Sequence, residues 1–331
     1  MHEPAAHPAP PAAPDAAAPA SAAPIMPAMT PRARRQGIRN AFDRAAAHYD
    51  EAALIQREIC SRLSAFAIGL DLKPPAGTDA AVLDAGCGTG FGFAELDRLC
   101  PGATRIALDL APSMLAQAGR RHERARAATI RAQLAEAAAC AEIARAHDAG
   151  ISSGLLAVCG DLEHLPLASG RIALIWSSLA IQWCEPGRAL ADCARVLAPG
   201  GIALVATLGP RTLWELREAF ALIDGARHTI DFHPATIWLR AAHAAALTPI
   251  AHETLELHAS APDLRGLLQD IKRIGAATVD GGRRRQPLGR AAWTRLQDGY
   301  ERHRRSDGRL PATYEVILLA LRKPAPSPPS R

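Results

Sequence analysis

Nine residues in the first third of the chain constrain its fold more than any other segment. They read Val82-Leu-Asp-Ala-Gly-Cys-Gly-Thr-Gly90, a short apolar run that ends in an acid and continues into three alternating glycines. This pattern is typical of a buried parallel strand that leads through a tight turn into a helix. Gly86, Gly88 and Gly90 can adopt positive φ and let a ligand approach the backbone. A nicotinamide-binding turn would begin in the same way.

Two further acids follow strand-like segments, at positions that a doubly wound fold uses for ligand binding. Asp109 ends the run Thr-Arg-Ile-Ala-Leu-Asp, about 20 residues after the turn, and Asp161 follows the apolar residues 155–159. Three acids at successive strand ends suit adenosine with a cationic tail better than a dinucleotide, because Asp84 would repel an anionic pyrophosphate. The predicted ligand is S-adenosylmethionine.

With these residues in place, the chain resembles the class I S-adenosylmethionine-dependent methyltransferases. Residues 172–177 (Ile-Ala-Leu-Ile-Trp-Ser) are similar to the fourth strand of that fold, and residues 196–207 to its next helix end, turn and fifth strand. The resemblance covers roughly residues 80–210. It implies a doubly wound α/β fold with a mostly parallel, Rossmann-like sheet of seven strands, an antiparallel edge strand and a helical lid.

A narrower resemblance lies outside this core. Residues 41–50 (Ala-Phe-Asp-Arg-Ala-Ala-Ala-His-Tyr-Asp), 178–184, 270–276 and 311–315 are similar, in order and place, to the biotin-pathway malonyl-acyl-carrier-protein O-methyltransferases. The resemblance implies methylation of the free carboxylate of a malonyl thioester on acyl carrier protein, or of its coenzyme A thioester. The methyl ester disguises the substrate so that fatty-acid synthesis can extend it towards pimeloyl and biotin.

The resemblance to methyltransferases also implies roles for the strand-end residues. Asp84 would face the ammonium group of the cofactor, and the backbone amides of residues 86–90 would meet its carboxylate. Asp109 would accept the ribose hydroxyls and Asp161 the adenine amine. For each acid the alternative is a turn or helix N-cap role. The residues that would flank the adenine ring are Leu110 and Leu162.

The methyl acceptor imposes a different requirement on the site. A malonyl carboxylate is already ionised at neutral pH, so methyl transfer needs no general base and depends on holding the reacting groups in line in a dry pocket. Hydrogen-bond donors or cations must hold the carboxylate. The candidates with a direct role in catalysis are Tyr49, Gln182 and Trp183, and the candidates for substrate binding are His233, Lys272 and Arg273. For the two aromatic residues, packing in the core is the alternative.

Composition and pattern predict one catalytic domain with additions. Residues 1–35 are rich in Ala and Pro and predict a disordered tail, so that translation could begin at Met1 or Met29. We expect a helical cap over 36–75, the methyltransferase domain over 76–323 and a second tail over 324–331. Within the domain we expect a helical insertion at 120–150, lid helices at 211–246 and 262–310, and late strands at 250–257 and 314–321.

Charge and cysteine content limit the partners. Seven scattered cysteines without a Cys-x-x-Cys pair predict neither disulfides nor a metal site. No apolar run approaches the length of a membrane span, so we expect a cytoplasmic monomer. The C-terminal part is rich in arginine, which predicts either a solvated face or a docking surface for an acidic carrier. Nucleic acid is disfavoured because only two aromatic residues, Trp293 and Tyr300, stand among these arginines. The arginines are Arg283, Arg284, Arg285, Arg290, Arg295, Arg302, Arg304, Arg305 and Arg309.

Two other functions remain open at this point. The first is a methyltransferase of the same fold that acts on a quinone precursor or another free acid, and a base close to the sulfonium would favour it. The second is an S-adenosylmethionine-binding assembly factor that transfers no methyl group. The intact glycine turn and the three acids argue for cofactor binding in either case.

Overall fold

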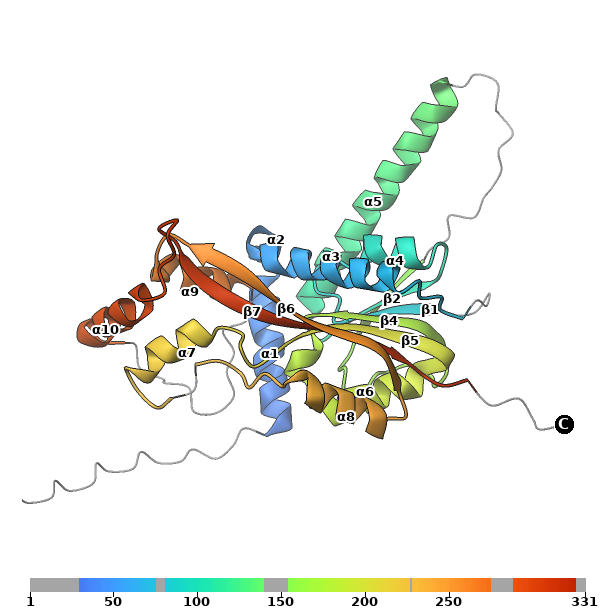
Figure 1. The fold of residues 1–331 in the computed structure, drawn as a ribbon. Coiled ribbons are helices and arrows are strands. Elements are labelled where there is room, and N and C mark those ends of the chain that lie inside the picture. The colour runs from blue at the N-terminus through green and yellow to red at the C-terminus, as the bar shows by residue number, and fades with distance from the viewer. Residues whose placement is uncertain (1–29, 76–80, 140–153, 227, 275–287, 326–331) are drawn as a thin grey trace, which may run out of the picture.

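The computed structural model describes residues 30–75, 81–139, 154–226, 228–274 and 288–325, and within them seven strands form one sheet (Figure 1). The strand order is β3-β2-β1-β4-β5-β7-β6, and the pairs from β3 to β5 are parallel. The order reverses at β1, and open sheets bind ligands at such a point. The strands are β1 (Ala81–Ala85), β2 (Arg105–Asp109), β3 (Leu155–Cys159), β4 (Ile172–Ser178), β5 (Leu197–Leu208), β6 (Thr248–Ala261) and β7 (Leu310–Arg322).

The predicted class I methyltransferase fold is confirmed, with a more exact place for the reversed strand. β7 pairs antiparallel with β5 on one side and with β6 on the other. The reversed strand therefore lies one position in from the edge, and the edge strand β6 runs in the same direction as β5. β6 and β7 are long, and Figure 1 shows them extending beyond the other strands towards α9 (Leu264–Arg273) and α10 (Arg290–Glu301).

Helices cover both faces of the sheet (Figure 1). On one face, α3 (Leu54–Gly69) and α4 (Phe93–Leu99) contribute Ile59, Leu63 and Leu96 to a core that contains Trp176 of β4. On the other face, α6 (Pro186–Val196) and α8 (Ala235–Ala244) pack against the alternate residues of the strands. β4 is buried on both faces, which explains its continuous apolar sequence.

The N-terminal cap consists of α1 (Pro31–Ala45) and the single turn α2 (Tyr49–Ala52). The Thr30 side chain accepts a hydrogen bond from the Ala33 N–H at 3.3 Å, and a proline follows it, as is typical of a helix start. The last five residues of the predicted tail, 31–35, are thus helical, and residues 1–29 lie outside the described residues. Asp43 Oδ1 accepts the Ser113 N–H at 2.9 Å and links α1 to the start of α5 (Pro112–Ala139).

The predicted insertion continues a helix of the core. α5 (Pro112–Ala139) extends away from the sheet in Figure 1, and its residues 123–131 are all exposed. Residues 140–150 lie outside the described part. Among the helices that the structure describes, none is both long and apolar enough to cross a membrane. The remaining helices are the 3₁₀ turn η1 (Ile181–Trp183), α7 (Trp214–Ala221), α9 (Leu264–Arg273) and α10 (Arg290–Glu301).

Candidate active site

The turn after β1 forms one wall of a pocket that lies at the carboxyl ends of the central strands, and we call it the inner pocket. Gly86, Gly88 and Gly90 have φ angles of 77°, 53° and 86°, in the left-handed region. A Cβ on Gly86 would lie 2.1 Å from the Ala180 Cβ. This position therefore requires glycine both for its dihedral angles and for the space that it leaves.

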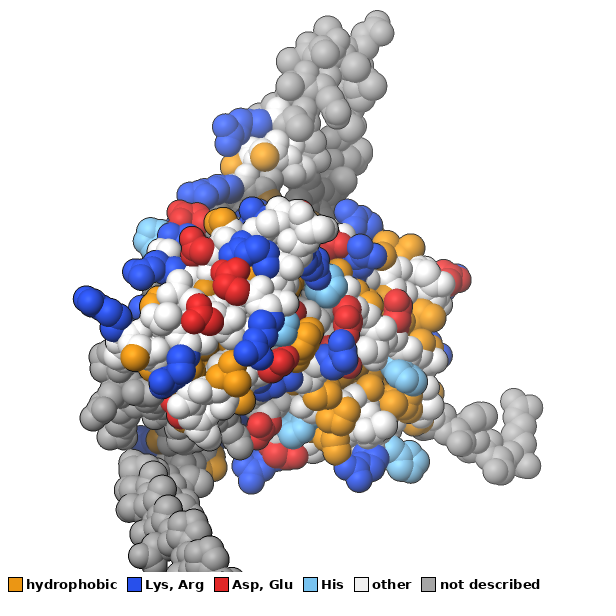
Figure 2. Space-filling view, turned by 60° about the vertical axis from the view of Figure 1, so that its left-hand side comes forward, with side chains coloured by type: hydrophobic (Ala, Val, Ile, Leu, Met, Phe, Trp, Pro, Cys, Tyr) orange, Lys and Arg blue, Asp and Glu red, His pale blue; other side chains and the backbone are white. Residues whose placement is uncertain are grey.

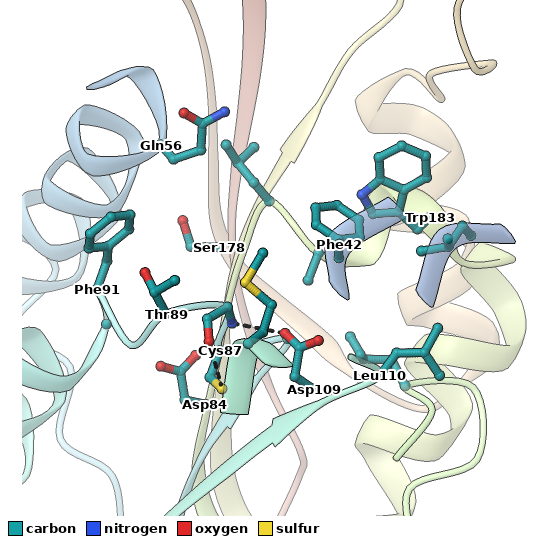
Figure 3. Close-up of a pocket in the computed structure, with 18 of the residues that line it drawn as sticks. Phe42, Gln56, Asp84, Cys87, Thr89, Phe91, Asp109, Leu110, Ser178 and Trp183 are labelled. Carbon is teal, nitrogen blue, oxygen red and sulfur yellow. Dashed lines mark hydrogen bonds between the residues drawn. The ribbon is translucent and has the colours of Figure 1, made fainter. Parts of the chain in front are cut away.

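All three strand-end acids line the inner pocket, as do Leu110 and Leu162. Figure 3 shows Asp84 and Asp109 on either side of the turn. The parallel register places the carboxyl ends of β1, β2 and β3 at the same edge of the sheet, and this brings side chains far apart in sequence to one cavity.

Asp84 is a buried carboxylate without a full set of partners. Its side chain is 2% exposed, and Oδ2 has no hydrogen-bond partner among the described residues. The pKa of Asp84 is raised to about 7, mainly by burial; the Arg105 guanidinium opposes this shift, and the nearby Asp109 adds a smaller upward contribution. A buried carboxylate of this kind is a strong binding group for a cation, because a positive partner would offset the cost of its burial.

Asp109 is held in a fixed orientation. Its Oδ2 accepts the Gly88 N–H at 2.9 Å, and its Oδ1 accepts the Ala111 N–H at 2.8 Å. Burial raises the pKa of Asp109 to about 6, and these two hydrogen bonds oppose the shift. Each carboxylate oxygen keeps lone pairs that can accept hydrogen bonds from the hydroxyl groups of a ligand. Asp109 therefore both shapes the turn and faces the pocket.

Asp161 has a partner that the sequence did not reveal. Arg35 of α1 places its Nε 2.5 Å from Asp161 Oδ2 and its Nη2 2.6 Å from Glu163 Oε2. The structure thus places Asp161 in the pocket wall but pairs it with the cap helix. A second Asp161 oxygen accepts the Glu163 N–H at 2.9 Å, which is the turn role that the sequence left open.

An adjoining cavity, the outer pocket, shares one wall with the inner pocket. The residues common to both are Phe42, Tyr49, Gln56, Leu179 and Trp183. Two of the three predicted catalytic residues, Tyr49 and Trp183, therefore stand between the two cavities. Figure 3 shows Trp183 and Phe42 together on one side, and their rings meet edge to face with centroids 5.6 Å apart.

Tyr49 is fixed from the opposite side. Its ring stacks on Phe91 with centroids 6.3 Å apart, and the guanidinium groups of Arg57 and Arg121 both contact the Phe91 ring, at 4.9 and 4.7 Å from its centroid. Burial, with Asp109 and Asp50 nearby, raises the pKa of Tyr49 well above its ordinary value. The hydroxyl therefore stays protonated at neutral pH and can donate a hydrogen bond.

Gln182 lies only in the outer pocket. Its Nε2 donates to the Leu179 carbonyl at 2.7 Å, and its buried Oε1 has no partner in the described part of the chain. The amide nitrogen carries a second N–H that is still able to donate to a ligand. The structure thus places Gln182 in the wall of the outer pocket, with one hydrogen bond to the backbone that fixes its amide.

The three predicted substrate-binding residues separate in the structure. Lys272 of α9 lines the outer pocket. Arg273 points elsewhere and pairs with Asp270 at 3.6 Å. His233 precedes α8, where its ring meets Trp238 edge to face with centroids 6.2 Å apart, and it lines neither pocket. Ile271 and Lys272 of α9 line the outer pocket, whereas Arg273, the next residue along the helix, lines neither pocket.

Comparison with known proteins identifies the family. A protein-family model described as a methyltransferase domain matches residues 83–205 of this chain. A malonyl-acyl-carrier-protein O-methyltransferase from Laribacter hongkongensis is 43% identical over 296 residues, which cover 88% of this chain and 90% of that protein. The chain belongs to this family of O-methyltransferases.

Two other similar proteins differ in how much of their length this chain matches. A biotin biosynthesis bifunctional protein from Cellvibrio japonicus is 35% identical over 88% of this chain, which matches 50% of that longer protein. A putative methyltransferase from Bacillus halodurans has a similar structure, with a TM-score of 0.50 and 16% identity, over 80% of this chain and all of that one. The second similarity supports the methyltransferase fold alone.

Several residues of this O-methyltransferase site were not singled out from the sequence. Gln56 and Cys60 of α3 line the inner pocket with Met114 of α5, and Tyr314 of β7 lines the outer pocket. Tyr314 lies in the segment 311–315 that carries the family resemblance, which was the available signal. Gln56 and Met114 had none, because a single polar or apolar residue on a helix does not show which cavity it faces.

Proposed function

We propose that this chain transfers the methyl group of S-adenosylmethionine to the free carboxylate of a malonyl thioester on acyl carrier protein, or on coenzyme A. The observation that carries the proposal is an inner pocket with three strand-end acids that adjoins an apolar outer pocket across Tyr49 and Trp183. The relatives' names supply the malonyl carrier acceptor and biotin synthesis as the pathway.

The residues of the inner pocket fit this cofactor. Asp84 offers an unpaired oxygen to the ammonium group, and Asp109 offers lone pairs to the ribose hydroxyls. Leu110 and Leu162 provide apolar surface for the adenine ring, with Asp161 at the pocket wall. When bound, S-adenosylmethionine supplies an electrophilic methyl group on its sulfonium sulfur. The chain itself has to hold that group in line with the acceptor and exclude water.

The outer pocket suits an acceptor that is already a carboxylate. The Tyr49 hydroxyl can donate to one carboxylate oxygen and leave the other oxygen free to react. Lys272 adds a positive charge on the α9 side of the cavity. Phe42 and Trp183 form an apolar wall that keeps water from the reacting oxygen. No residue needs to remove a proton from this acceptor, because the carboxyl group ionises far below neutral pH.

The direct test is a transfer assay with methyl-labelled S-adenosylmethionine and purified carrier protein loaded with malonyl or succinyl groups. We expect label on the malonyl carrier as a base-labile methyl ester, formed faster than on the succinyl carrier. The unloaded carrier is the control for methylation of the protein itself. Label that reaches a phenolic acceptor and neither thioester would contradict the proposal.

One observation favours a second function, methylation of a phenol or quinol. His228 lines the outer pocket, its Nε2 lies 2.8 Å from Asp224 Oδ1, and its ring stacks on Phe220 with centroids 3.6 Å apart. A histidine oriented by a carboxylate is a common general base. His228 does not line the inner pocket, however, and is not one of the residues that the two pockets share.

We further propose that the carrier docks on the arginine-rich end around α10, where the described residues include six of the nine arginines. Arg302 and Arg305 are exposed and have no ion pair with another described residue, whereas Arg304 pairs with Glu301. Figure 2 brings this end of the molecule forward and shows basic and acidic side chains interspersed. Arg283, Arg284 and Arg285 lie outside the described residues.

Charge reversal tests this surface. Arg302→Glu combined with Arg305→Glu is expected to raise the KM for the malonyl carrier by about threefold to tenfold, more at low salt, because exposed charges act mainly through steering. The KM for malonyl-coenzyme A should stay unchanged. Arg240→Glu on α8 is the matched control and should alter neither. An equal loss with both substrates would indicate damage to the fold and contradict the docking surface.

A further inference from the structure

Two buried polar groups at the floor of the inner pocket have no partner, and they are neighbours. Asp84 of β1 and Trp176 of β4 are directly paired in register. Trp176 is fully buried, and its indole Nε1 has no hydrogen-bond partner among the described residues, as is true of Asp84 Oδ2. Buried polar atoms are nearly always satisfied in folded proteins, so two orphans side by side in a ligand pocket indicate that a ligand completes them.

The two groups are of opposite kinds. An indole N–H can only donate a hydrogen bond, whereas an ionised carboxylate oxygen can only accept one. The ligand part that satisfies both must present an acceptor and a donor close together. An α-amino acid in its zwitterionic form does so, with a carboxylate and an ammonium group on one carbon atom.

Gly92 keeps the space between them open. A Cβ at this position would lie 2.8 Å from Asp84 Oδ2 and 2.8 Å from Trp176 Nε1, so both polar atoms lie close to the same point beside the Gly92 α-carbon. The φ of Gly92 is −70°, an angle that any residue adopts. Unlike Gly86, Gly92 is therefore required for the room it leaves and not for its backbone conformation.

We propose that Trp176 is a cofactor-binding residue: its N–H donates to the carboxylate of the amino-acid end of S-adenosylmethionine, whose ammonium group is held by Asp84, in the space that Gly92 leaves. This inference rests on the proposed function, because it takes the cofactor from it. The inference gives the cofactor carboxylate a side-chain donor from β4, in addition to the backbone amides of the glycine turn.

A pair of ligands separates this contact from the rest of the pocket. S-adenosylhomocysteine carries the amino-acid end, and 5′-methylthioadenosine has the same adenosine and sulfur without it. Calorimetry should show that Trp176→Phe weakens binding of S-adenosylhomocysteine by about 10- to 100-fold, the range for a hydrogen bond to a charged group. Binding of 5′-methylthioadenosine should change less than about twofold. The second ligand thus reports whether the pocket remains folded.

Two further variants complete the test. Gly92→Ala places a methyl group in the shared volume and should also weaken S-adenosylhomocysteine selectively. Trp238→Phe is the matched control, since Trp238 is likewise fully buried with an unpartnered Nε1 but lines neither pocket. It should leave both affinities unchanged.

Three results would overturn the inference. Unchanged S-adenosylhomocysteine binding in Trp176→Phe would mean that the N–H meets water. Equal loss of both ligands would mean that the ring acts by packing alone. Wild-type protein that binds neither ligand would refute the cofactor assignment itself, and the inference with it.

Discussion

Asp84→Asn is expected to weaken S-adenosylmethionine binding by a factor of about 100 or more and, at the same time, to stabilise the cofactor-free protein at alkaline pH. The loss of affinity follows from removing the buried charge that faces the ammonium group, since breaking a buried ion pair costs roughly 3 to 5 kcal/mol. The gain in stability follows from the raised pKa of this carboxyl group. Calorimetry measures the first effect, and denaturant unfolding the second.

The sign of the stability effect depends on pH. Because the pKa of Asp84 rises from its ordinary 3.8 to about 7 on folding, the protonated form is favoured in the native state. The contribution of this raised pKa to the free energy of unfolding is fully present below about pH 4 and is lost as the pH rises through about 7. The advantage of the Asn variant should therefore be roughly 2 to 3 kcal/mol larger at pH 8 than at pH 5, at 1.36 kcal/mol per unit.

Asp298→Asn, on the exposed side of α10, is the control and should change neither quantity. An advantage of Asp84→Asn that is the same at both pH values would show that the carboxyl group is not buried as an acid of raised pKa. Unchanged cofactor affinity would remove Asp84 from the site.

The rate of methyl transfer in a single turnover is expected to vary less than about twofold between pH 6 and pH 8, at saturating cofactor. A carboxylate acceptor has lost its proton well below this window, so no group has to act as a base. A phenol acceptor would need one, and with the base titrating in this range the rate could rise by up to about tenfold per pH unit. Rapid-quench measurement of the methyl ester separates the two cases.

Tyr49→Phe refines this test. The variant should lower the rate because the acceptor loses a positioning hydrogen bond, while the pH profile keeps its flat form. His228→Gln should leave the rate on the malonyl carrier nearly unchanged. A rate that climbs tenfold per unit in the wild type and becomes flat in the His228 variant would instead establish the second function.

The sequence was most informative where structure is local. The strand, turn and helix around residues 82–99 follow from an apolar run, three glycines and a helical pattern, which are short-range properties. The same holds for Asp109, because the end of the next parallel strand has a narrow range of positions in this fold. Tyr49 and Trp183 were predicted by resemblance, and the structure places both at the junction of the two pockets.

The pairing of side chains across the molecule had no such signal. Arg35 and Glu163 are 128 residues apart and meet only because α1 folds over the end of β3. His233 and Arg273 carry plausible chemistry, yet the directions of their side chains take them away from the outer pocket. Which residues of α9 face the cavity depends on how the helix packs, and composition does not record this.

The sequence by itself determined the strand and turn around residues 82–90 and the places of the three acids at strand ends, since these depend on short apolar runs and on glycine's backbone freedom. The charge of these acids indicated the cofactor class, and the resemblance to class I methyltransferases supplied the rest of the fold. Only the tertiary structure decided that β7 lies inside the sheet edge, that Asp161 pairs with the cap, and that Gly92 opens onto Asp84 and Trp176. These features depend on strand register and on the space between elements, where contacts form between residues that no local pattern connects.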